Sequence, residues 1–586
     1  MFDIKKFKRR LIGLAVASSL VWAVGCNKEK ASDKYTDLKA YLNITDVGGY
    51  KGAAVVVDGV AEGVGFVEGD EFYLPYDVVR GSVDNNYYWD ATEKVLSYAT
   101  SKKVYDAKAG VSEYTEDGVA KSCGSNIVLC VDEKAYISLE YIELMNGAID
   151  GETFDEPNRV LINTKDSVEV VKAKSDAKLR TGSSNKDDIV ADVSKGDKLT
   201  VIKDKGEKTF VYTEDGLMGY IEDSKVSSAT LEAVKKEQGW METDKYEYIS
   251  MDGKVCLGWH QMEAEGGNSS LSSVINGTDG LNVISPTWFK LIDSNGSISS
   301  LASSSYVDKA HNNGLQVWGL ISDFNYDDEG NYYVNTVVKS TTARRKLIEN
   351  IINEATECGM DGINVDFEMV RKVAAEGYVQ FIRELAIACE KENLVLSVDM
   401  YVPTESNQYY DRESVGLVAD YLIIMGYDEH WATCGSAGSV ASLPYVTNGI
   451  TDTLASVPAE RVINAIPFYT RIWYQDSLEN APEGAIVIED SINGDYALSS
   501  RAVGMGVAEK LLKENGATSR WLEDLGQNYG EFYTSEGRYG KVWLEDKESL
   551  TCKLNVMKAN NLAGVACWKL GLESEEAWEA IGEFLK

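Results

Sequence analysis

Residues 361–368 read Asp-Gly-Ile-Asn-Val-Asp-Phe-Glu, with apolar and polar side chains in alternation. Because successive side chains of a β-strand point to opposite faces, this alternation predicts a strand with one apolar and one polar face. The apolar face would carry Ile363, Val365 and Phe367, and the polar face would carry Asn364, Asp366 and Glu368. In a closed barrel the apolar face meets the surrounding helices and the polar face looks inward.

From about Met251 to the C-terminus, apolar β-type runs alternate with amphipathic helical patterns such as 341–358 and 374–390. Eight strands are predicted, at Val255–His260, Leu281–Trp288, Leu315–Ile321, Gly362–Glu368, Leu394–Tyr401, Tyr421–Tyr427, Val462–Phe468 and Leu562–Leu570. Eight strands favour a closed parallel (β/α)8 barrel, a TIM barrel, over residues 250–586.

The interval between Phe468 and Leu562 is long, so we expect an insertion after the seventh strand, with an extra strand at 540–546. The alternative architecture is a doubly wound open sheet. The sequence contains no Gly-rich phosphate loop of the kind that many such sheets carry, which favours the barrel.

The polar face of the 361–368 strand places two carboxyl groups inside the barrel, roughly 6–7 Å apart along the strand. No Lys or Arg lies in this strand. Burying carboxylates without a cation is costly, so they must hydrogen-bond or share a proton, and we expect a raised pKa on at least one. Glu368 lies at the carboxyl end of the strand, at the barrel mouth, and is the predicted proton donor.

The same segment resembles the D-x-x-D-x-D-x-E signature of glycoside hydrolase family 18, the chitinase-like barrels. Asn364 stands where most chitinases have Asp, and this version resembles the branch of spore-cortex and cell-wall N-acetylglucosaminidases. The resemblance implies that Glu368 protonates the glycosidic oxygen and that the substrate's own 2-acetamido oxygen attacks the anomeric carbon. It also implies that Asp366 orients the acetamido group, supported from behind by Asn364 and Asp361. An Asn can exchange hydrogen bonds with Asp366 but cannot share a proton with it.

Two further motifs agree with this resemblance. Met425-Gly426-Tyr427-Asp428 is similar to the family's M-x-Y-D, which implies a substrate-binding loop. In that loop Tyr427 would hydrogen-bond the acetamido carbonyl and Asp428 would bind sugar hydroxyls. Residues 564–568 are similar to the closing G-x-x-x-W, with Trp568 as the floor under the sugar ring. Taken alone, either aromatic residue would more often belong to a core.

Two smaller domains are predicted before the barrel. Residues 40–165 hold short β-type runs, and two strand-then-helix stretches loosely resemble the α+β domain named from the N-terminus of copper amine oxidases. Residues 168–227 resemble a bacterial SH3-like domain, a small β barrel that often holds cell-wall peptides. A structural spacer is the alternative for both domains. A short helix plus linker is expected at 228–248.

The N-terminus predicts export. Five cations within 1–10 precede an apolar stretch that ends at Ala23-Val24-Gly25-Cys26, the pattern of a signal peptide. It resembles a bacterial lipobox with Cys26 as the acylated residue, although leucine is more usual than Ala23. We therefore expect a lipoprotein signal at 1–26, a polar tether at 27–39, and a chain anchored to the membrane and facing the cell wall. An ordinary secretory signal or an uncleaved anchor is the alternative.

The composition of the chain argues against some classes of binding partner. Lys and Arg number 58 against 93 Asp and Glu, a net charge of −35, which repels nucleic acid and anionic lipid but suits a neutral sugar polymer. The cysteines outside the signal show no paired C-x-x-C spacing, so a metal site is not expected. No other cofactor is implied, because the substrate's acetamido group and two carboxyl groups suffice for the reaction that the resemblance implies. Cys123 and Cys130 flank a short turn, and a disulfide between them is left open.

These observations predict a glycoside hydrolase that acts on peptidoglycan or a related glycan containing N-acetylglucosamine. A non-catalytic glycan-binding scaffold is one alternative, and a hydrolase of chitin or N-glycans is another. The sequence indicates neither endo nor exo cleavage, and it carries no signal for an oligomeric state.

Overall fold

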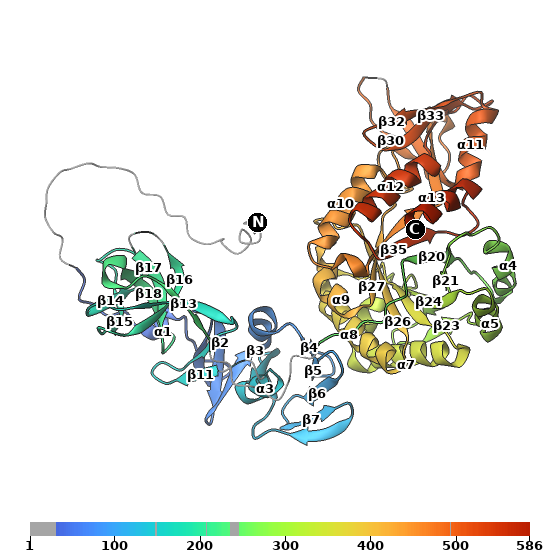
Figure 1. Ribbon diagram of the computed structural model, residues 1–586. Coiled ribbons are helices and arrows are strands. Elements are labelled where there is room, and N and C mark those ends of the chain that lie inside the picture. The colour runs from blue at the N-terminus through green and yellow to red at the C-terminus, as the bar shows by residue number, and fades with distance from the viewer. Residues whose placement is uncertain are drawn as a thin grey trace.

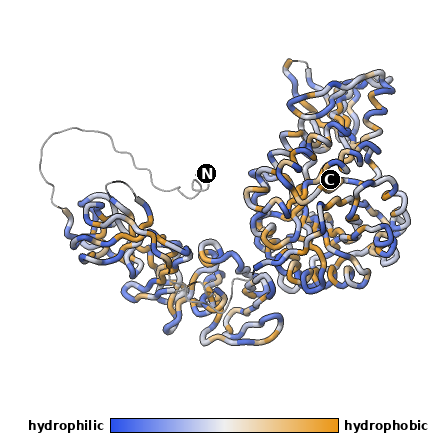
Figure 2. Tube along the Cα trace, viewed as in Figure 1, coloured by the Kyte–Doolittle hydropathy of each residue, from blue (hydrophilic) through white to orange (hydrophobic). Residues whose placement is uncertain are grey.

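The computed structural model describes residues 31–586 except 147, 148, 150, 205, 207, 235–244 and 493. The predicted signal segment and Cys26 lie outside the described residues. Hydrophobic and hydrophilic residues are interspersed along the chain in every domain (Figure 2). Within the described ranges, no helix is both long and apolar enough to cross a membrane.

The C-terminal part of the chain is a closed parallel barrel (Figure 1). Its eight strands are β20 (Val255–His260), β21 (Val283–Pro286), β24 (Gln316–Ser322), β25 (Gly362–Asp366), β26 (Val395–Tyr401), β27 (Tyr421–Met425), β28 (Val462–Pro467) and β35 (Gly564–Trp568). Strand β20 pairs with β35 on one side and β21 on the other, and β21 also pairs with β24, so the sheet has no break. This confirms the predicted barrel and all eight of its strands, and excludes the doubly wound sheet.

Helices cover the outside of this barrel (Figure 1). They are α4 (Leu271–Val274), α5 (Ser304–Asn312), α6 (Val334–Val337), α7 (Thr341–Cys358), α8 (Ala375–Lys391), α9 (Arg412–Val418), α10 (Leu443–Leu454), α12 (Lys547–Ala559) and α13 (Glu575–Leu585). Helix α7 begins after Ser340, whose hydroxyl accepts a hydrogen bond from the Ala343 amide. It ends at Gly359, whose left-handed backbone (φ 72°) turns the chain into β25.

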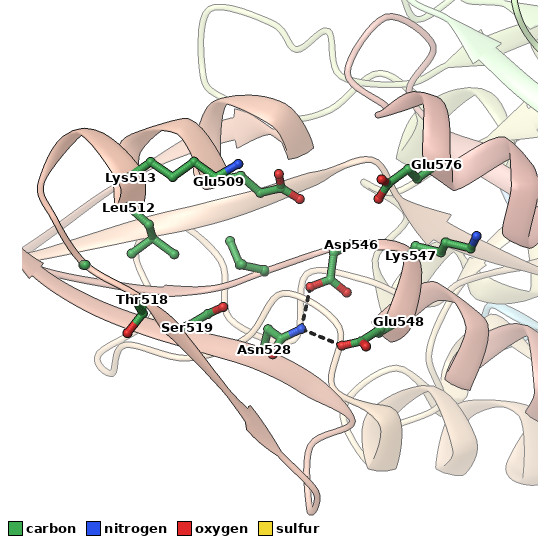
Figure 3. Close-up of a pocket in the computed structure, with 12 residues that line it drawn as sticks. Glu509, Leu512, Lys513, Thr518, Ser519, Asn528, Asp546, Lys547, Glu548 and Glu576 are labelled. Carbon is green, nitrogen blue, oxygen red and sulfur yellow. Dashed lines mark hydrogen bonds between the residues drawn. The ribbon is translucent and has the colours of Figure 1, made fainter.

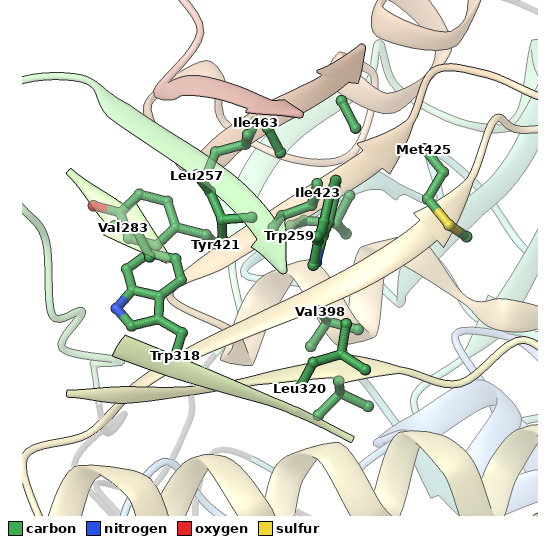
Figure 4. Packing of buried hydrophobic residues seen from close by; sticks show 14 of the residues in the cluster. Leu257, Trp259, Val283, Trp318, Leu320, Val398, Tyr421, Ile423, Met425 and Ile463 are labelled. Carbon is green, nitrogen blue, oxygen red and sulfur yellow. The ribbon is translucent and has the colours of Figure 1, made fainter. Parts of the chain in front are cut away.

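The interior of the barrel is apolar toward the amino ends of the strands (Figure 4). Trp318 of β24 and Tyr421 of β27 stack there, with ring centroids 5.6 Å apart. Further apolar side chains from these two strands and from β20, β21 and β28 complete the cluster, among them Leu257, Val283, Leu320, Ile423 and Ile463. Toward the carboxyl ends, β25 and β26 contribute buried polar side chains instead. The residues at the amino ends of the strands therefore form the core, and the polar residues at the carboxyl ends are available for a functional site at the barrel mouth.

The insertion lies where it was predicted, between β28 and β35. It forms a six-stranded antiparallel sheet in the order β30-β31-β29-β34-β33-β32, packed against α11 (Met505–Glu514). Its strands are β29 (Tyr469–Asp476), β30 (Ile486–Ile488), β31 (Tyr496–Gly504), β32 (Ser519–Leu522), β33 (Gln527–Tyr533) and β34 (Tyr539–Trp543). The extra strand expected at 540–546 corresponds to β34.

The first N-terminal domain contains two sheets. One holds β1 (Lys51–Val57), β2 (Val60–Glu68), β3 (Glu71–Pro75), β9 (Val128–Val131), β10 (Lys134–Ser138), β11 (Gly151–Phe154) and β12 (Arg159–Ile162). The other is a meander of β4 (Tyr87–Asp90), β5 (Val95–Ala99), β6 (Val104–Lys108), β7 (Glu113–Glu116) and β8 (Val119–Ser122). Strand β3 leads into α2 (Tyr76–Val78), and β10 into α3 (Leu139–Met145), as the two similar stretches predicted. Cys123 and Cys130 are both free thiols, so the pairing left open does not form here.

The second N-terminal unit is an antiparallel sheet that extends beyond the predicted 168–227. It comprises β13 (Ser167–Lys172), β14 (Ala177–Arg180), β15 (Ile189–Val193), β16 (Lys198–Asp204), β17 (Lys208–Thr213), β18 (Met218–Glu222) and β19 (Thr230–Ala233). The helix expected after 228 is wrong for 230–233, because the free edge of β13 recruits that segment as β19. Ala54 and Leu161 of the first domain share a buried cluster with Leu179 and Val211 of this sheet, so the two units pack together.

The β4–β8 meander docks on the barrel at the start of α7. The buried carboxylate of Asp90 accepts hydrogen bonds from the amide (2.7 Å) and the hydroxyl (2.9 Å) of Thr341. The Arg344 guanidinium lies 4.9 Å from the centre of the Tyr88 ring. The N-terminal domain therefore supplies part of the cap of a barrel helix.

Candidate active site

The candidate site lies at the carboxyl ends of β24 to β27. Asp366 is the last residue of β25, and Glu368 follows two residues later in the loop. The predicted inward face is confirmed at Asn364, because its side chain meets Trp259 of β20 and Asp399 of β26 inside the barrel.

Glu368 is held by two neighbours that the sequence did not single out. The Tyr401 hydroxyl, at the end of β26, donates a 2.6 Å hydrogen bond to Oε2 of Glu368. The Glu368 amide donates to Oδ1 of Asp323 at 3.0 Å, which fixes the loop. Burial raises the pKa of Glu368, the hydrogen bond from Tyr401 opposes that rise, and the nearby charge of Asp428 adds to it. The expected raised pKa is therefore present on the predicted proton donor.

Asp366 is a buried carboxyl without a counter-ion. Among the described residues, its Oδ1 atom is buried and has no hydrogen-bond partner. Burial raises its pKa well above the ordinary value, and the charges of Glu368, Asp399 and Asp323 raise it further. An unpaired carboxyl oxygen beneath the mouth is free to accept a donor from a bound molecule.

Two buried aspartates of this cluster were missed by the sequence analysis. Asp323 follows β24 and accepts hydrogen bonds from the amides of Glu368 and Met369, and burial raises its pKa to about 7. Asp399 lies on β26, and burial raises its pKa well above the ordinary value. The alternation Ser397-Val-Asp399-Met-Tyr401 carried the signal for Asp399, since it repeats the polar inward face of the 361–368 strand.

The motif at the end of β27 contributes an aromatic residue and a carboxylate. Tyr427 is buried, and burial and the charges of Asp366 and Asp399 raise the pKa of its hydroxyl well above the ordinary value. Asp428 accepts a hydrogen bond from the hydroxyl of Tyr469, the first residue of the insertion. Met425 ends β27 and is buried at the level of Tyr401 (Figure 4). The structure therefore brings this motif to the same mouth as Asp366 and Glu368.

Trp568 ends β35 on another side of the mouth. Its ring meets the ring of Trp259 edge-on, with centroids 5.6 Å apart. The Trp259 indole N–H in turn donates to Oδ1 of Asn364 at 2.9 Å. The half-buried Trp568 ring is thus fixed by a buried indole that is itself hydrogen-bonded to the site.

The predicted role of Asp361 is wrong. This residue precedes the first residue of β25, so it lies at the amino end of the strand, about 16 Å along the strand from Asp366. Its Oδ2 accepts hydrogen bonds from the Val317 amide and from the His311 ring, both at 2.8 Å. Asp361 therefore joins α5 to the start of β24 and does not support Asp366.

A separate hollow of about 580 Å³ lies between the insertion and α12 (Figure 3). Its lining includes Asp546 and Glu548, and the Asn528 amide donates to both, at 2.9 and 3.0 Å. None of the predicted site residues lines it. In the described ranges, no group of three or more His, Cys, Asp or Glu side chains is arranged to hold a metal ion.

A parallel barrel with a cluster of buried carboxyl groups at its carboxyl end is suited to acid–base chemistry at its mouth. The model of glycosyl hydrolases family 18 matches residues 266–573, more than half of the sequence, and the chain belongs to this family. The family membership makes the barrel a glycosidase domain.

Several of the similar proteins come from Bacillus species. The chain is 25% identical over 325 residues to the uncharacterized glycosylase YvbX of Bacillus subtilis, covering 54% of this chain and 88% of that protein. It is 26% identical over 254 residues to the cortical fragment-lytic enzyme of Bacillus subtilis, covering 42% of this chain and only 55% of that enzyme. A solved structure of the Bacillus cereus spore cortex-lytic enzyme SleL matches 60% of this chain and 79% of its own, with 19% identity and a TM-score of 0.48.

Proposed function

We propose that this chain is an exported glycosidase that cleaves β-linked glycans containing N-acetylglucosamine, with peptidoglycan as its substrate. Membership of glycosyl hydrolases family 18 supports glycan hydrolysis. The similarity to cortical fragment-lytic enzymes supports a cell-wall glycan as the polymer. The net charge of −35 agrees with a substrate that is not a polyanion such as nucleic acid.

The observation that carries the proposal is the setting of Glu368. It lies at the barrel mouth, burial raises its pKa, and it sits beside a second buried carboxyl, Asp366. A carboxyl group that keeps its proton toward neutral pH can donate it to a glycosidic oxygen. A non-catalytic glycan-binding protein would not need a proton donor at this position.

The proposed reaction runs through the substrate's own acetamido group. Glu368 protonates the glycosidic oxygen, the bond to the leaving sugar breaks, and the acetamido oxygen attacks the anomeric carbon. Asp366 accepts the acetamido N–H and balances the positive charge of the cyclic intermediate. Glu368, now a carboxylate, takes a proton from the water that opens this ring, so the configuration is retained.

Three other side chains would hold the sugar in place. The Tyr427 hydroxyl lies near Asp366 and would donate to the acetamido oxygen. Asp428, fixed by Tyr469, would accept from sugar hydroxyls. The Trp568 ring would pack under the apolar face of the sugar. Met425, which is buried at the end of β27, would line the same site from the barrel interior.

The proposal includes a location. A signal segment with acylation at Cys26 would anchor the chain outside the membrane, where cell-wall glycans are the nearest polymer. The SH3-like resemblance of 168–227 would add contacts to wall peptides. The β13–β19 sheet is packed on the preceding domain, which in turn docks on α7. These units would therefore also hold the barrel at a fixed distance from the membrane.

The test is product release from purified peptidoglycan, chitin oligomers and N-glycans, read by mass spectrometry on residues 27–586. We expect new N-acetylglucosamine reducing ends from peptidoglycan and a loss of about 10³-fold or more in Glu368→Gln. Glu405→Gln, which changes an exposed acid in the loop after β26, is the matched control and should keep full activity.

Each alternative has its own outcome. Products from chitin or N-glycans alone would replace peptidoglycan with that substrate. Tight glycan binding without any product would refute hydrolysis and favour the binding-scaffold alternative.

A further inference from the structure

We infer that Asp399 shares a proton with Asp366. It thereby replaces the carboxylate that the family signature has at position 364. This inference rests on the proposed function and adds a positioning residue to it. Asp399 is buried on β26, a strand that lies outside the signature altogether.

The hydrogen bonds of Asn364 exclude it as the partner of Asp366. The indole N–H of Trp259 can only donate, so the atom facing it at 2.9 Å must be the amide oxygen, Oδ1. Ser285 also donates to Oδ1, at 3.3 Å. The amide nitrogen therefore faces β26, where it donates to Ser397 at 3.0 Å and to Asp399 at 2.8 Å. All four hydrogen-bonding positions of Asn364 are filled, and none reaches Asp366.

The strand register brings Asp399 to Asp366. Strands β25 and β26 are parallel, with Asn364 beside Ser397 and Val365 beside Val398. The next step of this register places Asp366 beside Asp399, with backbones about 4.8 Å apart and both side chains on the inward face. In the described structure, Asp366 Oδ1 is buried and has no hydrogen-bond partner. A carboxyl group next to it supplies the missing donor whenever it carries a proton.

In the described part of the chain, no cation acts on Asp366. The groups whose charges act on it are Glu368 and Asp323 from neighbouring loops and Asp399 from β26, all of them acids. The titratable groups around this cluster also include four tyrosines and one more acid: Tyr378 of α8, Tyr401, Tyr410, Tyr427 and Asp428. Arg412 donates to the carbonyl of Tyr401 and to Asn407, and not to a carboxylate. Two adjacent buried carboxyls without a cation hold one proton between them.

The shared proton gives Asp399 its role in the cycle. In the free enzyme the proton lies between the two carboxyls. When the acetamido group binds, the proton stays on Asp399, and Asp366 becomes the carboxylate that accepts the acetamido N–H. After product release the proton returns to the shared position, so no proton is gained or lost.

The first test compares Asp399→Asn with the transposed pair Asn364→Asp/Asp399→Asn. We expect D399N to lower kcat about 100-fold with little change in KM, since an amide cannot hold the shared proton. The transposed pair restores an acid at position 364, where Trp259 can still donate to it. We expect the kcat of the double variant to be at least tenfold higher than that of D399N.

The matched control is Asp420→Asn. Asp420 is another buried barrel aspartate, but it lies at the amino end of β27 and accepts from the Leu396 and Ile249 amides. It should leave kcat unchanged. If D399N does not fold, Asp399→Ser repeats the test. A D399N enzyme within twofold of the wild type, or a transposed pair no better than D399N, would overturn the inference.

A second readout keeps this inference separate from the proposed function. A thiazoline analogue of the cyclised N-acetylglucosamine takes up the shared proton at its ring nitrogen and then donates to the Asp366 carboxylate. Its binding needs no turnover and can be measured by calorimetry. We expect D399N to weaken that binding at least tenfold and to change its pH dependence. If the wild type cleaves no glycan, the proposed function fails, and equal binding by the wild type and D399N would then also overturn the role of Asp399. If the wild type does not bind the analogue either, both proposals fall.

Discussion

Tyr401→Phe is the sharpest probe of the candidate proton donor. This change removes one hydroxyl, the donor of the 2.6 Å hydrogen bond to Glu368, and leaves the ring that packs against Tyr410. A hydrogen bond to an ionised group contributes about 1.5–3 kcal/mol. One pKa unit corresponds to about 1.4 kcal/mol, so the pKa of Glu368 should rise by about one to two units.

The direction of the effect follows from the donor. The Tyr401 hydroxyl stabilises the ionised carboxylate, and its removal favours the protonated acid, so Glu368 keeps its proton to higher pH. The basic limb of the pH dependence of kcat/KM should therefore move upward by about one to two units. Because the acid is then weaker, kcat/KM at the wild-type optimum should fall by roughly tenfold.

The assay is hydrolysis of a soluble N-acetylglucosamine oligomer between pH 4 and 9. Tyr248→Phe is the control, since its hydroxyl donates to the Leu417 carbonyl outside the carboxyl cluster. It should not move either limb. A basic limb that stays in place or moves downward in Y401F would contradict the assignment of Glu368 as the acid.

Three further variants test stability and substrate binding. Lys553→Ala should lower the free energy of unfolding by about 3–5 kcal/mol in denaturant titrations, because it leaves the fully buried Glu545 unpaired. Asp90→Ala should cost about 1.5–3 kcal/mol in the same assay, because Thr341 loses the acceptor of two hydrogen bonds. Trp431→Ala removes a ring that is 53% exposed in the loop after β27, and it should raise KM for long glycans several-fold and leave that for a disaccharide unchanged.

Each of these variants has a matched control. Lys547→Ala breaks an exposed ion pair with Glu579 and should change the unfolding curve little, so an equal effect of both lysines would contradict the burial argument. Asp90→Asn keeps an acceptor for Thr341 but loses the one for the Thr92 and Glu93 amides, so it should retain only part of the stability that Asp90→Ala loses. Trp521 in the insertion sheet also has an exposed ring, at 36%. Trp521→Ala should leave KM unchanged, and an equal rise of KM in both variants would contradict a specific contact between the Trp431 loop and the glycan.

The stability of the barrel should also depend on pH in a definite direction. Burial raises the pKa values of Asp366, Asp399 and Asp323, so these groups favour folding when protonated. Their contribution is present below the unfolded value of about 3.9 and is lost as pH rises through the folded values. D399N should therefore raise the Tm at pH 7 and flatten the decline of Tm with pH. A steeper decline of Tm with pH in D399N would contradict the argument that these buried carboxyl groups have no counter-ion.

Local sequence patterns were sufficient to predict the strands, most of the helices and the family resemblance. Apolar and polar side chains alternate with period two in strands and about 3.6 in helices, so 255–260 or 421–427 could be assigned to strands without knowing their neighbours. The same periodicity put Glu368 at a strand end and Asp366 on the polar face. Local spacing fixes such features because they depend only on residues a few positions apart.

Which side chains come into contact depends on the fold as a whole. Asp361 and Asp366 belong to one short motif, yet they lie at opposite ends of β25. Asp361 is therefore hydrogen-bonded to His311 and not to Asp366. Asp399 and Tyr401 lie more than 30 positions beyond Glu368 and reach the site because β25 and β26 pair in parallel register. That register is set by barrel closure and by burial of the whole sheet, which no local pattern encodes.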